Sequence, residues 1–140
     1  MKLLITTLTM IFISFGAHAF NVETLYKYCK PYQNNGFSWD NLSKSKIQDG
    51  IICISYFRGL GEAGYGTCDY FRRVYDRGLI DIKAFKTLSS LTANEKFGSV
   101  TQIITSFINF AENNPQHWKY SPYNYTNKYI SEKFPCKLDK

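Results

Sequence analysis

The sequence predicts an all-α fold, a small bundle of about four to six helices stapled by two disulfides. Apolar residues recur at helical spacing in several segments, and no sustained alternation of apolar and polar residues indicates a β-strand. The chain also contains four cysteines, an even number. In a small exported domain, such a count is typical of disulfides that supplement a modest hydrophobic core.

The first 19 residues have the pattern of a secretory signal peptide. Lys2 gives a basic start, residues 3–15 form an apolar run, and Ala17-His18-Ala19 is typical of a cleavage site. The run is too short to span a bilayer of about 30 Å, and no later segment reaches the roughly 20 apolar residues of a transmembrane helix. We therefore expect residues 20–140 to form a single domain in the periplasm or outside the cell, with no membrane partner.

The N-terminal half predicts two helices joined by a loop. Val22, Leu25 and Cys29 share one face of a helix over residues 22–30, which Pro31 is expected to end. The turn-rich segment 31–45 is predicted to be a loop, and Ser43 or Ser45 to cap a helix over residues 46–65. Several glycines inside this second helix suggest that neighbouring elements pack closely against it, since glycine otherwise destabilises a helix. They are Gly59, Gly61, Gly64 and Gly66.

The C-terminal half predicts shorter helices. Apolar spacing from Tyr70 to Tyr75 indicates one that Gly78 ends, and residues 80–88 indicate another. A capping box at residues 92–95 precedes an amphipathic helix that ends near residues 113–115. The last helix is predicted to begin at Ser121-Pro122, with the serine as cap, and to end at residues 135–136. Four residues share one face of it: Tyr123, Asn127, Ile130 and Phe134.

The cysteines Cys29, Cys53, Cys68 and Cys136 allow three pairings. A helical hairpin of the first two helices would bring Cys29 to Cys53 and leave Cys68 for Cys136, so this pairing is favoured. Each closed loop would stabilise the fold by about 3–4 kcal/mol in the chain-entropy model. The absence of a Cys-x-x-Cys motif disfavours a thioredoxin-like redox site.

The residue inventory disfavours an enzyme. After export His117 is the only histidine, and paired cysteines leave no thiolate for a nucleophilic pair. The widely spaced cysteines do not form a metal-ligand cluster, so we expect neither a metal nor a cofactor. No two carboxylates can be assigned to a shared cleft, although Glu62 is unusual in a glycine-rich helix. The net charge of +6 is only weak support for nucleic-acid binding in an exported protein, and we expect no such partner.

Aromatic residues make up 17% of the chain, and several lie in predicted loops together with amides. This composition is typical of protein-binding surfaces, although burial in the core is the alternative for each ring. The most basic patch comprises Arg72, Arg73 and Arg77, with Lys83 and Lys86 near it in the sequence; it is either a solvated face or a contact for an acidic partner.

The cysteine motifs resemble those of a known family. They are Tyr-Lys-Tyr-Cys29, Cys53-Ile-Ser-Tyr-Phe-Arg-Gly59, Cys68, Asn113-Asn114-Pro115-Gln116, and Lys-Phe134-Pro135-Cys136. Together they resemble the Rap/Tai family of immunity proteins of type VI secretion systems, over nearly the whole exported chain. The Ile-Pro that often follows the third cysteine in that family is replaced here by Asp69-Tyr70.

The resemblance implies a periplasmic immunity protein without catalytic residues. Such a protein binds a peptidoglycan amidase delivered by the type VI secretion system and blocks its active site; a homodimer remains an open alternative. We expect the loop before the last helix to insert, through Asn114, Gln116, His117, Trp118, Lys119 and Tyr120, and Arg72, Arg73 and Arg77 to rim or steer the contact. A periplasmic holdase-type chaperone is the second hypothesis, and a small muramidase-like enzyme is the third.

Overall fold

The computed structural model describes residues 20–90 and 99–138, and this part of the chain is helical without a β-strand element. The helices are α1 (Val22–Asn34), α2 (Lys44–Asp76), α3 (Ile82–Ser89), α4 (Val100–Asn113) and α5 (Pro122–Lys133), with a short 3₁₀ helix η1 (Pro115–His117) before α5. The predicted all-α class is therefore confirmed. The signal peptide and the capping box at residues 92–95 lie outside the described residues.

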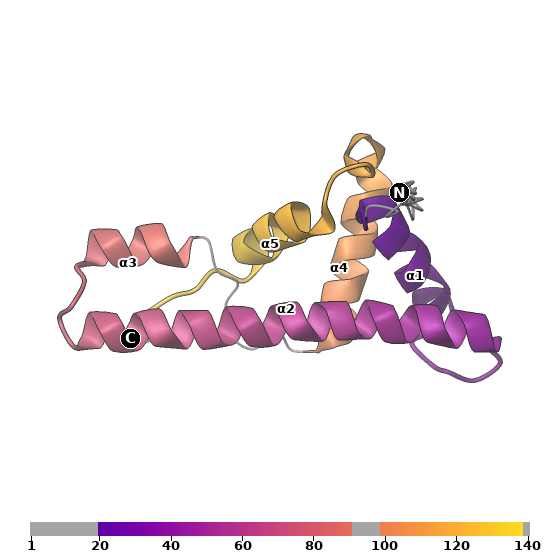
Figure 1. Ribbon diagram of the computed structural model, residues 1–140, viewed down its shortest axis with the longest axis horizontal. Coiled ribbons are helices and arrows are strands. Elements are labelled where there is room, and N and C mark those ends of the chain that lie inside the picture. The colour runs from indigo at the N-terminus through magenta and orange to yellow at the C-terminus, as the bar shows by residue number, and fades with distance from the viewer. Residues whose placement is uncertain (1–19, 91–98, 139–140) are drawn as a thin grey trace, which may run out of the picture.

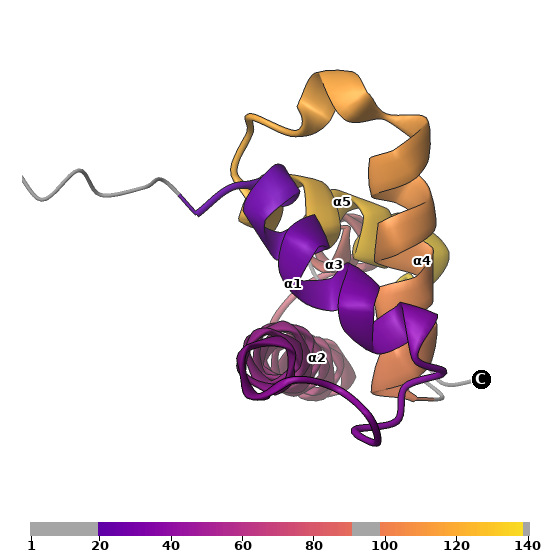
Figure 2. The ribbon, with the colours of Figure 1, turned by 90° about the vertical axis from the view of Figure 1, so that its right-hand side faces the viewer.

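Helix α2 is the axis of the molecule (Figure 1). Helices α1 and α4 cross its N-terminal half, whereas α3 lies beside its C-terminal half. A view along α2 shows the other helices gathered on one side of it (Figure 2). The fold is thus built from one long helix that carries two groups of shorter elements, one near each end.

Two apolar clusters correspond to these two groups. The larger joins α1, α2 and α4, where Phe57 and Phe107 lie with ring centroids 5.2 Å apart. Leu25, Ile104 and Ile108 are completely buried around them. Burial of each such side chain stabilises the fold by roughly 1.5–3 kcal/mol. The smaller cluster lies under α3 and contains Phe85 with the second disulfide.

Both disulfides have the favoured pairing. Cys29 and Cys53 join α1 to α2 with Cα atoms 5.2 Å apart, and Cys68 and Cys136 join the C-terminal tail to α2 with Cα atoms 5.7 Å apart. Disulfides persist in oxidising compartments, so they indicate an extracellular or periplasmic environment. Within the described residues, no helix has the length and apolar character needed to cross a bilayer.

The prediction that α2 ends near Tyr65 is wrong, and so is the separate helix at residues 70–75. The helix runs unbroken for 33 residues and ends, as Gly78 predicts, in a turn where that glycine has φ +70°. Cys53 and Cys68 anchor it to both clusters, so packing outweighs the low helix propensity of the glycines between them.

The glycines predicted to pack closely differ in burial. Gly61 is buried, whereas Gly59 and Gly66 are exposed and nothing lies within 4 Å of a Cβ added to either. A tight contact also occurs at Gly50, where an added Cβ would lie 2.7 Å from Cζ3 of Trp39. The ring of Trp39 stacks on Tyr32, with centroids 4.3 Å apart, so the 35–43 connection folds back on both helices.

Helix α1 continues past Pro31, which the sequence predicts to end it. The proline removes one helical hydrogen bond, but the next residue, Tyr32, is buried against Phe37 and Trp39. This aromatic packing carries the helix to Asn34. Helix α4 begins at Val100, because its N-cap Ser99 has an extended backbone with φ −159°. This start is later in the chain than the capping box at residues 92–95 predicts.

Helix α5 begins at Ser121-Pro122 as predicted, although the serine side chain makes no capping hydrogen bond. Its buried face comprises Pro122, Thr126 and Ile130. Tyr123, predicted to share a face with Ile130, is instead 58% exposed. Thr126 donates to the carbonyl of Pro122 and lies 3.0 Å from the hydroxyl of Tyr56 on α2, which anchors the helix.

Candidate functional site

The connection between α4 and α5, residues 114–121, is the candidate site and is called the interaction loop below. It arches away from α2 beyond the ends of α1 and α4 (Figure 2). All six predicted contact residues of this loop lie in η1 or directly beside it. Arg72, Arg73 and Arg77 lie at the opposite end of α2, near α3, so the structure does not bring the two predicted sets together (Figure 1).

Trp118 faces the protein interior. Its ring is half-buried and stacks on Tyr26 of α1, with centroids 5.3 Å apart and an angle of 27° between the ring planes. Its indole N–H donates to the carbonyl of Ala111 at the end of α4, with an N···O distance of 2.7 Å. Trp118 therefore joins the loop to two helices, and its main role in this structure is positional.

The backbone of the loop is held by the start of α1. The N–H of Val22 donates to the carbonyl of Tyr120, and the N–H of Glu23 donates to the carbonyl of Trp118, both at 3.0 Å. The first N–H groups of a helix have no partner within the helix, so this docking satisfies them while it fixes the loop. The two bonds fix the loop backbone at Trp118 and Tyr120.

His117 lies in an aromatic cluster. Its ring centroid is 4.4 Å from that of Tyr125 and 6.1 Å from that of Phe110, whose plane is nearly parallel. The Nδ1 atom is buried without a hydrogen-bond partner among the described residues. A histidine held in this way packs the loop against α4 and α5.

The outward residues of the loop are polar or aromatic. Gln116 and Lys119 are exposed, and Tyr120 is 47% exposed, with the Lys119 ammonium 5.9 Å from its ring centroid. Tyr123, in the first turn of α5, adds a second exposed tyrosine. Tyr123 was not among the predicted contact residues, although its position directly after Ser121-Pro122 places it beside the loop. Asn114 is half-buried and donates from its amide to the carbonyl of Phe110.

An ionic contact ties α4 to α1 close to the indole ring. One oxygen of Glu112, Oε1, accepts from the hydroxyl of Tyr26 at 2.9 Å and lies 2.7 Å from the ammonium of Lys30. The hydrogen bond from Lys30, followed by that from Tyr26, lowers the pKa of Glu112. Partial burial and the bond to Glu112 raise the pKa of Tyr26. The two helices that carry the loop are thus linked by charge as well as by packing.

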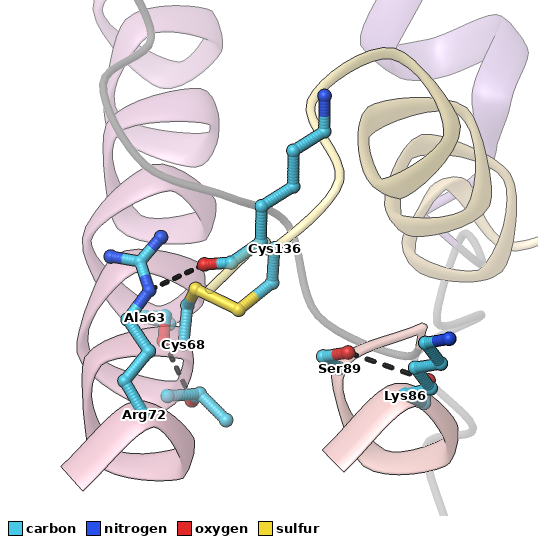
Figure 3. The surroundings of a disulfide bond; sticks show 8 residues. Ala63, Cys68, Arg72, Lys86, Ser89 and Cys136 are labelled. Carbon is cyan, nitrogen blue, oxygen red and sulfur yellow. Dashed lines mark hydrogen bonds between the residues drawn. A yellow bond between two sulfur atoms is a disulfide. The ribbon is translucent and has the colours of Figure 1, made fainter. Parts of the chain in front are cut away.

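The predicted basic patch is divided by the structure. Arg72 is buried, and its Nε donates to the carbonyl of Lys137 at 2.6 Å, beside the Cys68–Cys136 disulfide (Figure 3). Arg73 is exposed but paired with Asp69 at 2.9 Å, and Arg77 is exposed at the end of α2. The burial of Arg72 could have been predicted from the sequence, because Arg72 follows Cys68 by one helical turn and so lies on the same helix face as the disulfide.

Other chemistry finds little support in residues 20–90 and 99–138. No three potential metal ligands of the His, Cys, Asp and Glu types gather there. A groove of about 390 Å³ between α2 and α4 is lined by Phe57, Val100 and Ile103, with Glu62 beside Arg58. Among the described residues Glu62 is the only carboxylate that lines it. Comparison with protein-family models, with curated proteins and with solved structures finds no significant match to this chain.

Proposed function

We propose that this chain is a periplasmic immunity protein that binds a peptidoglycan amidase of a type VI secretion system and blocks its active site. The observation that carries the proposal is the interaction loop itself, a projecting segment fixed by the indole of Trp118, the start of α1 and the aromatic cluster around His117. The resemblance of the cysteine motifs to the Rap/Tai family supports the same function.

Occlusion of an enzyme requires rigid shape more than reactive groups. A loop that is already ordered loses less conformational entropy on binding, which favours affinity. Tyr120 and Tyr123 are exposed, and tyrosine is enriched among binding hot spots. Lys119 and Gln116 supply a polar rim. We assign contact with the amidase to these four residues and positioning to Trp118 and His117.

The compartment agrees with this role. Peptidoglycan lies outside the inner membrane, the predicted signal peptide would export the chain, and the two disulfides require oxidising conditions. In the proposed function the chain has no enzymatic activity, cofactor, nucleic-acid partner or membrane partner of its own, and the homodimer remains open.

The test is inhibition of an amidase effector encoded beside the gene for this protein. Residues 20–140, with both disulfides formed, should bind the effector and stop its cleavage of purified peptidoglycan. Tyr120→Ala should weaken binding by about tenfold or more, while Tyr65→Ala, an equally exposed tyrosine on α2, should leave it unchanged. Equal effects of the two variants would place the contact elsewhere, and failure to bind any neighbouring effector would refute the proposed function.

One observation favours the holdase hypothesis as a second candidate. Large apolar side chains of α2 and the turn after it are exposed, including Ile51, Ile52, Tyr70 and Leu79. Such a surface can hold unfolded chains. Suppression of the aggregation of a heat-denatured client protein, lost in Ile51→Ser/Ile52→Ser but retained in Tyr120→Ala, would support this candidate over the first.

A further inference from the structure

A second groove lies between α3 and the C-terminal tail, at the end of α2 opposite the interaction loop. It has a volume of about 400 Å³, within the range of small-molecule sites, and is called the tail groove below. Figure 3 shows part of its surroundings, with the tail at Cys136 on one side and α3 with Ser89 and Lys86 on the other. The disulfide to Cys68 and the hydrogen bond from Arg72 to the carbonyl of Lys137 fix the tail wall.

The walls of the tail groove are apolar. Ile82 and Phe85 contribute from α3, and Pro135 and Leu138 contribute from the tail. Phe85 is almost completely buried, whereas Ile82 is 45% exposed. A ligand with an alkyl chain would cover this apolar surface, and the removal of apolar area from water favours its binding.

Among the described residues that line the tail groove, the two charged ones are lysines. Lys86 lies on one wall and Lys137 on the other, and no carboxylate of residues 20–90 or 99–138 lines the groove. Neither ammonium lies within 4 Å of a carboxylate of residues 20–90 or 99–138, where the ion pairs are formed by other lysines and arginines. Two such cations beside an apolar channel complement one anionic head group.

The size of the groove limits the shape of the ligand. A volume of about 400 Å³ is that of a small-molecule site and is small for a docked α-helix, which is about 10 Å wide with its side chains. A single extended alkyl chain is much thinner. We therefore propose that the tail groove binds a free fatty acid, with its chain along Ile82, Phe85 and Leu138 and its carboxylate between Lys86 and Lys137.

The proposal is tested by titrating the disulfide-bonded chain, residues 20–140, with laurate below its micelle concentration. Calorimetry should give one site per chain, and amide chemical shifts should change in α3 and in residues 136–138. Dodecanol, which has the same chain without the charge, should bind about tenfold or more weakly. Lys86→Glu should weaken laurate binding by at least the same factor, because it replaces an attraction by a repulsion.

Lys83→Glu is the matched control, since it makes the same charge change on an exposed residue of α3 that does not line the groove. It should leave the laurate affinity within about twofold. Two tryptophan variants check the site independently. Ser90 lines the groove, so Ser90→Trp should block it and abolish laurate binding. Thr87 is not among the lining residues, so Thr87→Trp should leave laurate binding unchanged. Circular dichroism spectra confirm that each variant is folded.

Several results would overturn the proposal. Equal loss in Lys83→Glu and Lys86→Glu would show general charge attraction, and shifts confined to the groove between α2 and α4 would place the ligand there. Equal binding of dodecanol and laurate would show that the lysines do not contribute to the affinity for the carboxylate. Binding to phosphatidylglycerol vesicles without binding to monomeric laurate would identify a membrane surface in place of a fatty-acid site, and saturable binding of an acidic peptide alone would identify a protein partner.

Discussion

Replacing Trp118 by alanine tests whether the interaction loop is held from its inner side. The substitution removes the stack on Tyr26, the hydrogen bond to the carbonyl of Ala111 and the apolar contact with the main cluster. If Trp118 were chiefly a partner contact, the folded chain would lose little stability. The structure instead predicts a clear loss of stability in the absence of any partner.

The magnitude follows from these contacts. Truncation of a fully buried tryptophan typically costs about 3–5 kcal/mol, and Trp118 is only half-buried, so the packing contribution is nearer 2 kcal/mol. The hydrogen bond adds about 1 kcal/mol. We expect a total near 3 kcal/mol and a fall of the thermal midpoint by about 10 °C for a domain of this length. Trp118→Phe keeps a ring against Tyr26 but loses the hydrogen bond to Ala111, so it should cost about 1–2 kcal/mol.

The assay is urea and thermal unfolding followed by far-UV circular dichroism under oxidising conditions. Tyr120→Ala is the control, because Tyr120 neighbours Trp118 closely in sequence but its side chain is 47% exposed, and its loss should stay below about 1 kcal/mol. An unchanged midpoint for Trp118→Ala, or the same fall for both variants, would refute the assignment of Trp118 to positioning.

Three further predictions concern the scaffold. Gly59→Ala should stabilise the fold by up to about 1 kcal/mol, because its Cβ meets nothing, whereas Gly50→Ala should gain less or lose stability because its Cβ meets an indole ring; equal denaturation midpoints would contradict this. Replacing both Cys68 and Cys136 by alanine should cost about 4 kcal/mol for a loop of 68 residues, measured by urea unfolding; a loss below 1 kcal/mol would contradict the chain-entropy model. Glu112→Gln should reduce the fall in thermal midpoint between pH 7 and pH 3. The pKa of Glu112 is below its ordinary value of 4.5, so the ionised form stabilises the fold above pH 4.5 and loses that effect as the pH falls through the lower pKa. An unchanged fall in the midpoint would contradict the prediction.

Most helix positions could be predicted because they depend on local signals. The disulfide pairing followed from the expectation that the first two helices lie side by side, which pairs Cys29 with Cys53 and leaves Cys68 for Cys136. Gly78 ends α2 because its backbone is left-handed, a conformation that glycine adopts without strain. These features need only spacing and turn chemistry, which the sequence contains directly.

The continuity of α2 and of α1 could not be predicted, because both depend on tertiary contacts. Glycines such as Gly59 lower local helix propensity, and Pro31 removes a hydrogen bond, so local rules end both helices too early. The aromatic packing of Tyr32 and the second apolar cluster around Cys68 outweigh these costs. Neither contact is visible without the fold.

The direction of the loop side chains was equally hidden. The sequence shows that residues 114–120 are aromatic and polar, but it cannot distinguish an inward Trp118 from an outward Tyr120. That distinction comes from the carbonyl of Ala111 and the ring of Tyr26, which lie on two different helices. For the amidase contact, the prediction for the loop as a whole still stands untested, and the structure changes only which residues should be varied.

The two ends of α2 carry separate apolar clusters, each with its own disulfide, and this separation makes the two proposals independently testable. The interaction loop rests on the cluster that contains Cys29 and Cys53, whereas the tail groove depends on the bond from Cys68 to Cys136. Loss of the second disulfide should therefore release the tail and abolish laurate binding while leaving amidase inhibition intact. Loss of Trp118 should do the reverse. If either change disabled both activities, the long helix would be coupling its two ends, and the glycines between them would be the segment to examine.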